Sequence, residues 1–135
     1  MSLEPSHIRI AIALLYSTLS WAFGGFDYMF YALLTFIILD YISGIMVAIK
    51  TTNLSSNIGF RGIGKKVMIL IMVAIGNLID IAIIGSGHTC RTLVIAFYSA
   101  NEAISILENV SVLGLPLPEK IKALLEQFGK NKNSE

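Results

Sequence analysis

Four long apolar runs, separated by short polar segments, restrict the folds open to this chain of 135 residues. A helix of about 20 apolar residues is long enough to cross the roughly 30 Å hydrocarbon layer of a bilayer. Only 14% of the residues are charged, whereas a soluble domain usually carries about 25%. The sequence therefore predicts an all-α integral membrane protein in which residues 1–135 form a single membrane domain.

The apolar runs predict about four transmembrane helices and, after them, a short C-terminal amphipathic helix. The expected spans cover residues 8–26, 28–49, 67–84 and 92–115, and the amphipathic helix covers residues 118–128. Two prolines in residues 116–118 end the fourth span, because proline cannot continue a helix. The first apolar run itself ends at about Phe23 and is the shortest of the four, and its sequence leaves open whether it crosses the membrane or lies at its surface.

The distribution of basic residues predicts the orientation in the membrane. Four spans would place both termini and the loop of residues 50–66 on one side, together with nine of the ten Lys and Arg residues; only Arg91 lies opposite. Because excess Lys and Arg remain on the cytoplasmic side, both termini are predicted to be cytoplasmic. The basic loop is expected to contact lipid headgroups through Lys50, Arg61, Lys65 and Lys66.

Carboxylic acids interrupt three of the expected spans. Asp40 lies in the second, Asp80 in the third, and Glu102 and Glu108 in the fourth. Each costs about 2.5–3.5 kcal/mol near the centre of a span. No Lys or Arg lies inside the three expected spans that carry acids, so an internal ion pair is not expected. We therefore expect the acids to be protonated, hydrogen-bonded to neutral polar residues, or exposed to water.

Helical spacing gathers small and polar residues on the same faces as these acids. We predict that the following residues line helix interfaces or a pore: Asp40, Ser43, Gly44, Gly76, Asn77, Asp80, Asn101, Glu102, Ser105, Glu108 and Asn109. For Asn77 and Asp80, helix association and a functional role are equally consistent with the pattern. The stripe on the fourth span favours contact with water. Because four small helices can hardly enclose a wide aqueous path, we also expect a homo-oligomer.

Two shorter motifs predict no ligand site. Residues 59–66 fit the pattern G-x-x-x-x-G-K, but Lys66 occupies the place of the Ser or Thr that binds magnesium, and no strand precedes it. His88 and Cys90 supply two potential ligands, fewer than a zinc site requires. We therefore expect no cofactor and no metal site. The net charge of +1 gives no overall field that would attract nucleic acid, and no Ser-His-Asp or Cys-His set can be assembled, so we also expect no nucleic-acid partner and no enzymatic activity.

Three segments resemble the toxin-secretion and phage-lysis holins, found mainly in Gram-positive bacteria, their phages and clostridial toxin loci. Residues 39–67, "LDYISGIMVAIKTTNLSSNIGFRGIGKKV", resemble the family's Asp-Tyr-x-x-Gly segment, its basic loop and its Gly-Lys-Lys entry to the next span. Residues 76–80, "GNLID", resemble the acid-bearing third segment. Residues 100–121, "ANEAISILENVSVLGLPLPEKI", resemble the Asn-Glu pair, the Glu-Asn pair and the proline-bounded terminal helix.

This resemblance implies a multi-pass protein of the bacterial cytoplasmic (inner) membrane. Such a protein would accumulate in the bilayer, assemble with copies of itself and open lesions through which an endolysin or a toxin reaches the cell wall. Two other functions remain open. A small proton-coupled multidrug exporter has a similar size, although the first apolar run here carries no acid. A non-conducting accessory subunit of a larger membrane complex would use the acids only for assembly.

Overall fold

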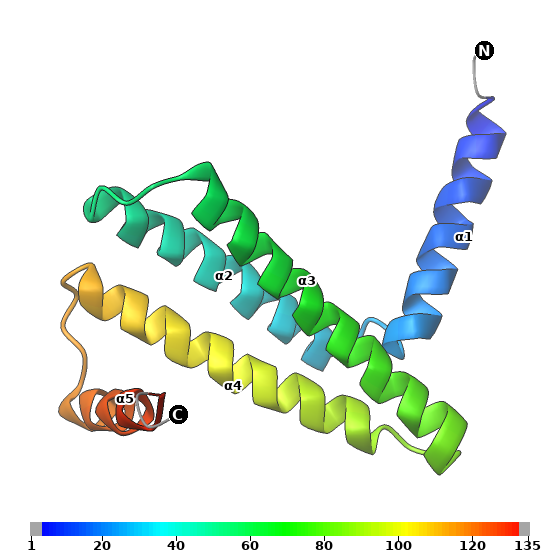
Figure 1. Cartoon of the computed structure of the whole chain (residues 1–135). Helices are drawn as coiled ribbons and strands as arrows, with labels where there is room; N and C mark the ends of the chain where they lie inside the picture. The colour runs from blue at the N-terminus through cyan, green and yellow to red at the C-terminus, as the bar shows by residue number, and fades with distance from the viewer. Residues whose placement is uncertain (1–3, 133–135) are drawn as a thin grey trace.

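The computed structural model describes residues 4–132, and these residues form helices joined by short connections (Figure 1). The elements are α1 (Pro5–Phe23), α2 (Tyr28–Lys50), α3 (Ser56–Ile79), the π-helical turn η1 (Asp80–Ile84), α4 (Thr89–Val112) and α5 (Glu119–Lys132). The expected all-α fold is confirmed, with no strand between residues 4 and 132. The two ends of the expected domain, residues 1–3 and 133–135, lie outside the described residues.

Helices α2, α3 and α4 form a bundle in which each helix runs antiparallel to the one before it (Figure 1). Its apolar core lies in the half of the bundle where α2 and α4 begin and α3 ends. The buried core side chains are Phe30, Leu33 and Ile37 of α2, Ile69 and Val73 of α3, and Ile95 of α4. The other half of the bundle contains none of these core side chains, and polar groups lie there.

Helix α1 diverges from this bundle instead of packing along it (Figure 1). None of its residues is buried, and its hydrogen bonds to the bundle lie near its C-terminal end. There the Asn77 side-chain amide of α3 donates hydrogen bonds to the carbonyl oxygens of Trp21 and Ala22, at 2.9 and 3.0 Å. Gly24 ends α1 in the left-handed conformation, with φ of 75°. A Cβ atom at this position would lie 2.3 Å from Asn77 Oδ1, so the attachment requires glycine.

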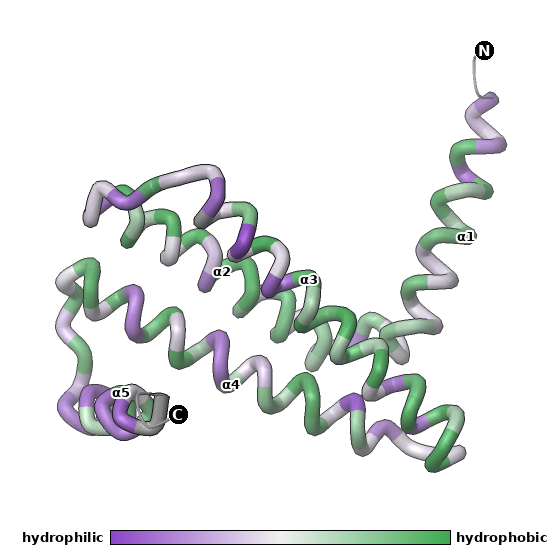
Figure 2. Tube along the Cα trace, viewed as in Figure 1, coloured by the Kyte–Doolittle hydropathy of each residue, from purple (hydrophilic) through white to green (hydrophobic). Residues whose placement is uncertain are grey.

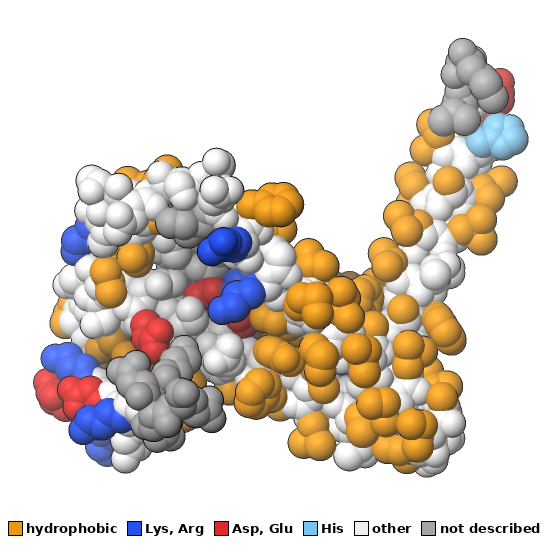
Figure 3. All heavy atoms as spheres, in the orientation of Figure 1, with side chains coloured by type: hydrophobic (Ala, Val, Ile, Leu, Met, Phe, Trp, Pro, Cys, Tyr) orange, Lys and Arg blue, Asp and Glu red, His pale blue; other side chains and the backbone are white. Residues whose placement is uncertain are grey.

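Two helical segments, Tyr28–Lys50 and Gly59–Ile84, are long and apolar enough to cross a membrane. They correspond to the second and third expected spans. Helix α4 carries Arg91, Glu102 and Glu108, and Figure 2 shows hydrophilic positions recurring along it. Figure 3 shows that hydrophobic side chains cover α1 and the half of the bundle next to it, whereas charged side chains gather at the opposite end.

Helix α3 begins at Ser56, eleven residues before the expected start of the third span at residue 67. The prediction that residues 50–66 form a loop is therefore wrong for their second half. Tyr41 of α2 lies beside this stretch, where Cβ atoms at Gly59 and Gly62 would each be 3.6 Å from its ring or hydroxyl. The glycines and polar residues of this segment suggest a loop, but as a helix it packs against α2. The expected C-terminal helix is present as α5, set apart from the bundle (Figure 1).

Candidate functional site

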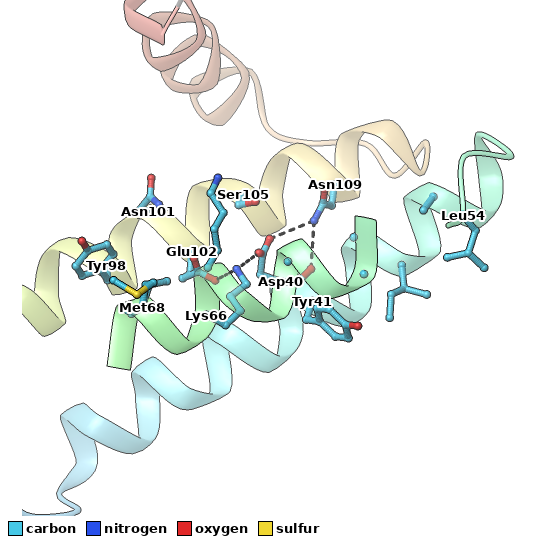
Figure 4. A pocket seen from close by; sticks show the side chains of 17 residues that line it. Asp40, Tyr41, Leu54, Lys66, Met68, Tyr98, Asn101, Glu102, Ser105 and Asn109 are labelled. Carbon is cyan, nitrogen blue, oxygen red and sulfur yellow. Dashed lines mark hydrogen bonds and ion pairs between the residues drawn. The ribbon is translucent and has the colours of Figure 1, made fainter. Parts of the chain in front are cut away.

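Three charged side chains, one from each helix of the bundle, meet near its centre. The Lys66 ammonium of α3 donates to Asp40 Oδ2 of α2 and to Glu102 Oε2 of α4 (Figure 4). The exposed fractions of the Asp40, Lys66 and Glu102 side chains are 12%, 17% and 4%. We call this group the charged triad. It links all three helices through a single ammonium group.

The helix boundaries explain how residues so distant in the sequence meet. Asp40 lies ten residues before Lys50, the last residue of α2, and Glu102 lies ten residues before the end of α4 at Val112. Lys66 lies ten residues after the first residue of α3. Because α3 runs in the opposite direction, all three side chains stand about 15 Å from the same end of the bundle, at a rise of 1.5 Å per residue.

The triad shows that the prediction of no internal ion pair was wrong. That prediction placed Lys66 in a polar loop, whereas the early start of α3 puts Lys66 inside the apolar segment Gly59–Ile84. An ammonium group in this position offsets part of the cost of burying the two acids. The overlooked signal was helical spacing, which places Lys66 on the same face as Ile69 and Val73, both of which are buried.

Uncharged polar groups extend the triad toward the same end of the bundle. The Asn109 side-chain amide of α4 donates to Ser43 Oγ at 2.9 Å and to Asp40 Oδ1 at 3.3 Å. Ser43 in turn donates to the Asp40 carbonyl oxygen at 3.1 Å. These bonds join α2 to α4 and hold the Asp40 carboxylate from a second direction.

A cavity of about 520 Å³ opens between the helices beside the triad (Figure 4). We call it the central cleft. It reaches from Ala48 and Leu54, near the α2–α3 connection, to Ile69 and Tyr98 beside the core. The predicted site residues that line it are Asp40, Gly44, Lys65, Lys66, Asn101, Glu102, Ser105 and Asn109. The cleft thus joins one end of the bundle to a charged group near mid-helix.

A second polar cluster lies at the opposite end of the bundle. Asp80 accepts hydrogen bonds from the backbone N–H groups of Cys90 and Arg91, both at 2.9 Å, and so caps the start of α4. The Arg91 guanidinium donates to Asp27 Oδ2 at 2.8 Å and to the carbonyl oxygens of Gly25 and Phe23. These bonds fasten the α1–α2 connection to the start of α4.

Arg91 and Asp27 were not predicted as partners. Arg91 was expected to be a lone basic residue in an external turn, but it is only 2% exposed. Hydrogen bonds from the Arg91 guanidinium lower the pKa of the Asp27 carboxyl below its usual value, although partial burial opposes this effect. A clue was available in the sequence, because an Asp immediately before an apolar run is a common helix N-cap. Asp27 does accept a bond from the Phe30 N–H at 3.0 Å.

Most of the predicted site residues therefore fall into two groups, one beside the cleft and one in the second cluster. Gly76, Asn77 and Asp80 lie with the second cluster, away from the cleft, and their contacts join helices. A Cβ atom at Gly76 would lie 3.2 Å from the Arg91 backbone, so glycine allows α3 and α4 to approach closely at this point. Glu108 is half-buried on α4 and is not among the residues that line the cleft.

The remaining basic-loop residues also separate. Lys65 lies on the rim of the cleft, whereas Arg61 is exposed on the first turns of α3. Lys50 donates to the Val112 carbonyl oxygen at 2.7 Å and so connects the ends of α2 and α4. Contact of this group with lipid headgroups stays a prediction.

Comparison with known proteins connects this arrangement to a described family. The profile of the bacteriophage holin family matches residues 17–130, which include the triad, the cleft and the second cluster. An uncharacterized 14.9 kDa protein in the nagH 3′ region of Clostridium perfringens is 41% identical over 127 residues, covering 94% of this chain and 96% of that protein.

Two further relatives come from other Gram-positive bacteria. An uncharacterized protein of Listeria monocytogenes is 48% identical over 108 residues, covering 80% of this chain and 76% of its own length. An uncharacterized protein of Bacillus subtilis, YtkC, is 31% identical over 121 residues, covering 90% of this chain and 89% of its own length. No solved structure shows significant similarity to the chain.

Proposed function

Because the chain belongs to the bacteriophage holin family, we propose that it assembles with copies of itself in the bacterial cytoplasmic membrane and forms lesions there. These lesions release a cell-wall hydrolase or a toxin and thereby trigger lysis. The observation that carries the proposal beyond family membership is the charged triad near mid-helix, reached by a cleft from one end of the bundle. Ionisable groups at such a depth in membrane helices commonly mark a pathway for water or ions.

In a single copy, the cleft forms half of such a pathway. It extends from the α2–α3 connection to the triad, beyond which the apolar core of Phe30, Leu33, Val73 and Ile95 fills the bundle. A lesion therefore requires the helices to separate or several copies to combine. The polar face of α4, with Asn101, Glu102, Ser105 and Asn109, would then line a shared lumen, and the cargo would pass between copies rather than through one bundle.

We place the open end of the cleft on the cytoplasmic side. Lys50 and Arg61 lie at or toward that end of the bundle, and Lys and Arg near the ends of spans favour the cytoplasm. In this orientation α2, α3 and α4 cross the membrane. Four spans, with both termini cytoplasmic, result if α1 also crosses. Lys66 supports the insertion of α4 because it partly neutralises Glu102.

The proposal is tested by inducible expression of the full chain in a bacterium, with and without a cytoplasmic cell-wall hydrolase. Culture density and membrane potential are followed over time. We expect abrupt depolarisation in both cultures and lysis only where the hydrolase is present. Steady growth with an intact membrane potential, at confirmed membrane expression, would refute the holin function.

A pair of matched variants in α4 tests the role of the cleft. Glu102→Leu leaves Lys66 paired with Asp40 and should therefore insert and fold, but it removes a charge from the cleft lining. We expect it to abolish permeabilisation. Glu108→Leu makes the same change in the same helix outside the cleft, and we expect permeabilisation to persist. Full lysis by Glu102→Leu would contradict the role of the cleft.

A further inference from the structure

We propose that the central cleft is a contact surface for a second copy of this chain, and that Lys65 of each copy enters the cleft of its neighbour. This inference rests on the self-association in the proposed function and adds the surface and the contacting residue. It follows from the charge of the triad, the position of Lys65 and the geometry that a membrane imposes on neighbouring copies.

The triad carries more negative than positive charge. Asp40 and Glu102 are both acids, and Lys66 supplies a single ammonium between them, so the ionised group has a net charge of −1. The Glu102 side chain is only 4% exposed. An uncompensated charge in such surroundings is costly, and a nearby cation would lower that cost. The open side of the cleft gives a cation access to this group.

Lys65 is such a cation, and it stands at the opening. Lys65 lines the cleft next to Lys66 and is exposed. Within residues 4–132 it takes part in no ion pair. Each copy therefore presents an acidic cleft and an unpaired basic group on the same edge of α3. Surfaces of this kind are complementary to themselves, which favours contact between identical chains.

The membrane restricts which basic residue can make this contact. Copies inserted in the same orientation are related by an axis along the membrane normal, so equivalent residues keep the same depth. Lys65 is one residue from Lys66, about 1.5 Å along the helix, and therefore approaches a neighbour at the depth of its triad. Arg61 is about 7.5 Å away along α3, and Lys50 is about 15 Å from Asp40 along α2. Both therefore lie farther than Lys65 from the depth of a neighbour's triad.

The exposed polar edge of α4 supports the same contact. Asn101 lies next to Glu102 near the middle of α4, lines the cleft and is exposed. Asn side chains commonly hydrogen-bond across membrane helices, so this amide can bind a second copy. On the other side of the opening Met68, 55% exposed, also lines the cleft. Asn101 and Met68 thus mark its two edges and provide positions for crosslinking.

The test uses two differently tagged full-length copies, expressed together in bacterial membranes, with Cys90 replaced by Ala. One copy carries Met68→Cys, the other carries Asn101→Cys, and a short bis-maleimide reports their proximity. We expect a crosslinked heterodimer. In the matched control, the second copy carries Ile38→Cys instead of Asn101→Cys. Ile38 lies at nearly the depth of Asp40, on an exposed face of α2. We expect little crosslinking with this control.

Substitution of Lys65 then tests the charge. In both cysteine-bearing copies, Lys65→Glu should lower the crosslinked yield about tenfold, whereas Lys65→Arg should retain it. The proposal would be overturned if Lys65→Glu left the crosslinked yield unchanged. It would also be overturned if the Ile38→Cys control gave the same yield as the Asn101→Cys copy. A single chain that carries both Met68→Cys and Leu124→Cys tests whether α5 covers the cleft. Crosslinking within that chain, without crosslinking between copies, would show that α5 and not a second copy occupies the cleft.

Membrane potential measured in the same cells separates this inference from the proposed function. Crosslinking between copies without depolarisation would retain the interface and refute the lesion. Depolarisation without crosslinking between copies would retain the lesion and refute the interface.

Discussion

Replacing Lys66 by methionine removes the ammonium group that Asp40 and Glu102 share but keeps a side chain of similar length. The two carboxylates, with exposed fractions of 12% and 4%, would then face each other without a counter-charge. Breaking a buried ion pair by removing one partner typically costs about 3–5 kcal/mol. Because the cleft admits water to this site, we expect about 3 kcal/mol, or roughly a hundredfold change in the folding equilibrium.

A compensated variant separates charge from packing. Combining Lys66→Met with Asp40→Asn and Glu102→Gln removes all three charges and leaves groups of nearly the same shape. Because no unpaired charge then remains in the site, we expect this variant to regain most of the lost free energy. Arg61→Met, an exposed substitution in the same helix, should change stability by less than about 0.5 kcal/mol.

The assay is unfolding of the purified protein in detergent micelles, followed through its helical circular dichroism. An unfolding midpoint for Lys66→Met equal to that of the wild type would refute the argument that the triad holds the three helices together. If the compensated variant is as unstable as Lys66→Met, the loss arises from packing of the lysine stem and not from its charge.

Three further predictions concern the second cluster. The lowered pKa of Asp27 means that its bond to Arg91 contributes stability above the usual pKa of the group, and that this contribution is lost as the pH falls through the lowered value; the difference in melting temperature between wild type and Asp27→Asn should therefore shrink from neutral pH to about pH 3. Gly24→Ala should lower the melting temperature more than Gly25→Ala, because both positions have positive φ but only at Gly24 would a Cβ atom collide with Asn77; equal effects would contradict this. Asp80→Asn should cost about 1–3 kcal/mol of unfolding free energy, since an amide offers one acceptor oxygen to two backbone N–H groups, and an unchanged unfolding curve would show that the cap is dispensable.

Predictions from the sequence were accurate where a feature depends on neighbouring residues, and they failed where it depends on contacts between distant segments. Apolar runs and the proline-containing segment of residues 116–118 correctly predicted an all-α chain and the approximate positions of α2, α4 and α5. These features are local, because a helix satisfies its backbone hydrogen bonds within its own segment. The resemblance to holins, confirmed by the family match, likewise required only the order of residues along the chain.

Tertiary structure decided which charges meet. The sequence placed Asp40 and Glu102 on polar faces but could not show that α3 begins at Ser56, which brings Lys66 to the same depth. That start coincides with packing against Tyr41, a residue of another helix. Divergence of α1 from the bundle and the bond between Arg91 and Asp27 likewise depend on contacts between distant segments. Helix formation is thus determined by local apolar pattern, whereas the pairing of buried charges depends on helix register and direction, which arise only when the helices pack.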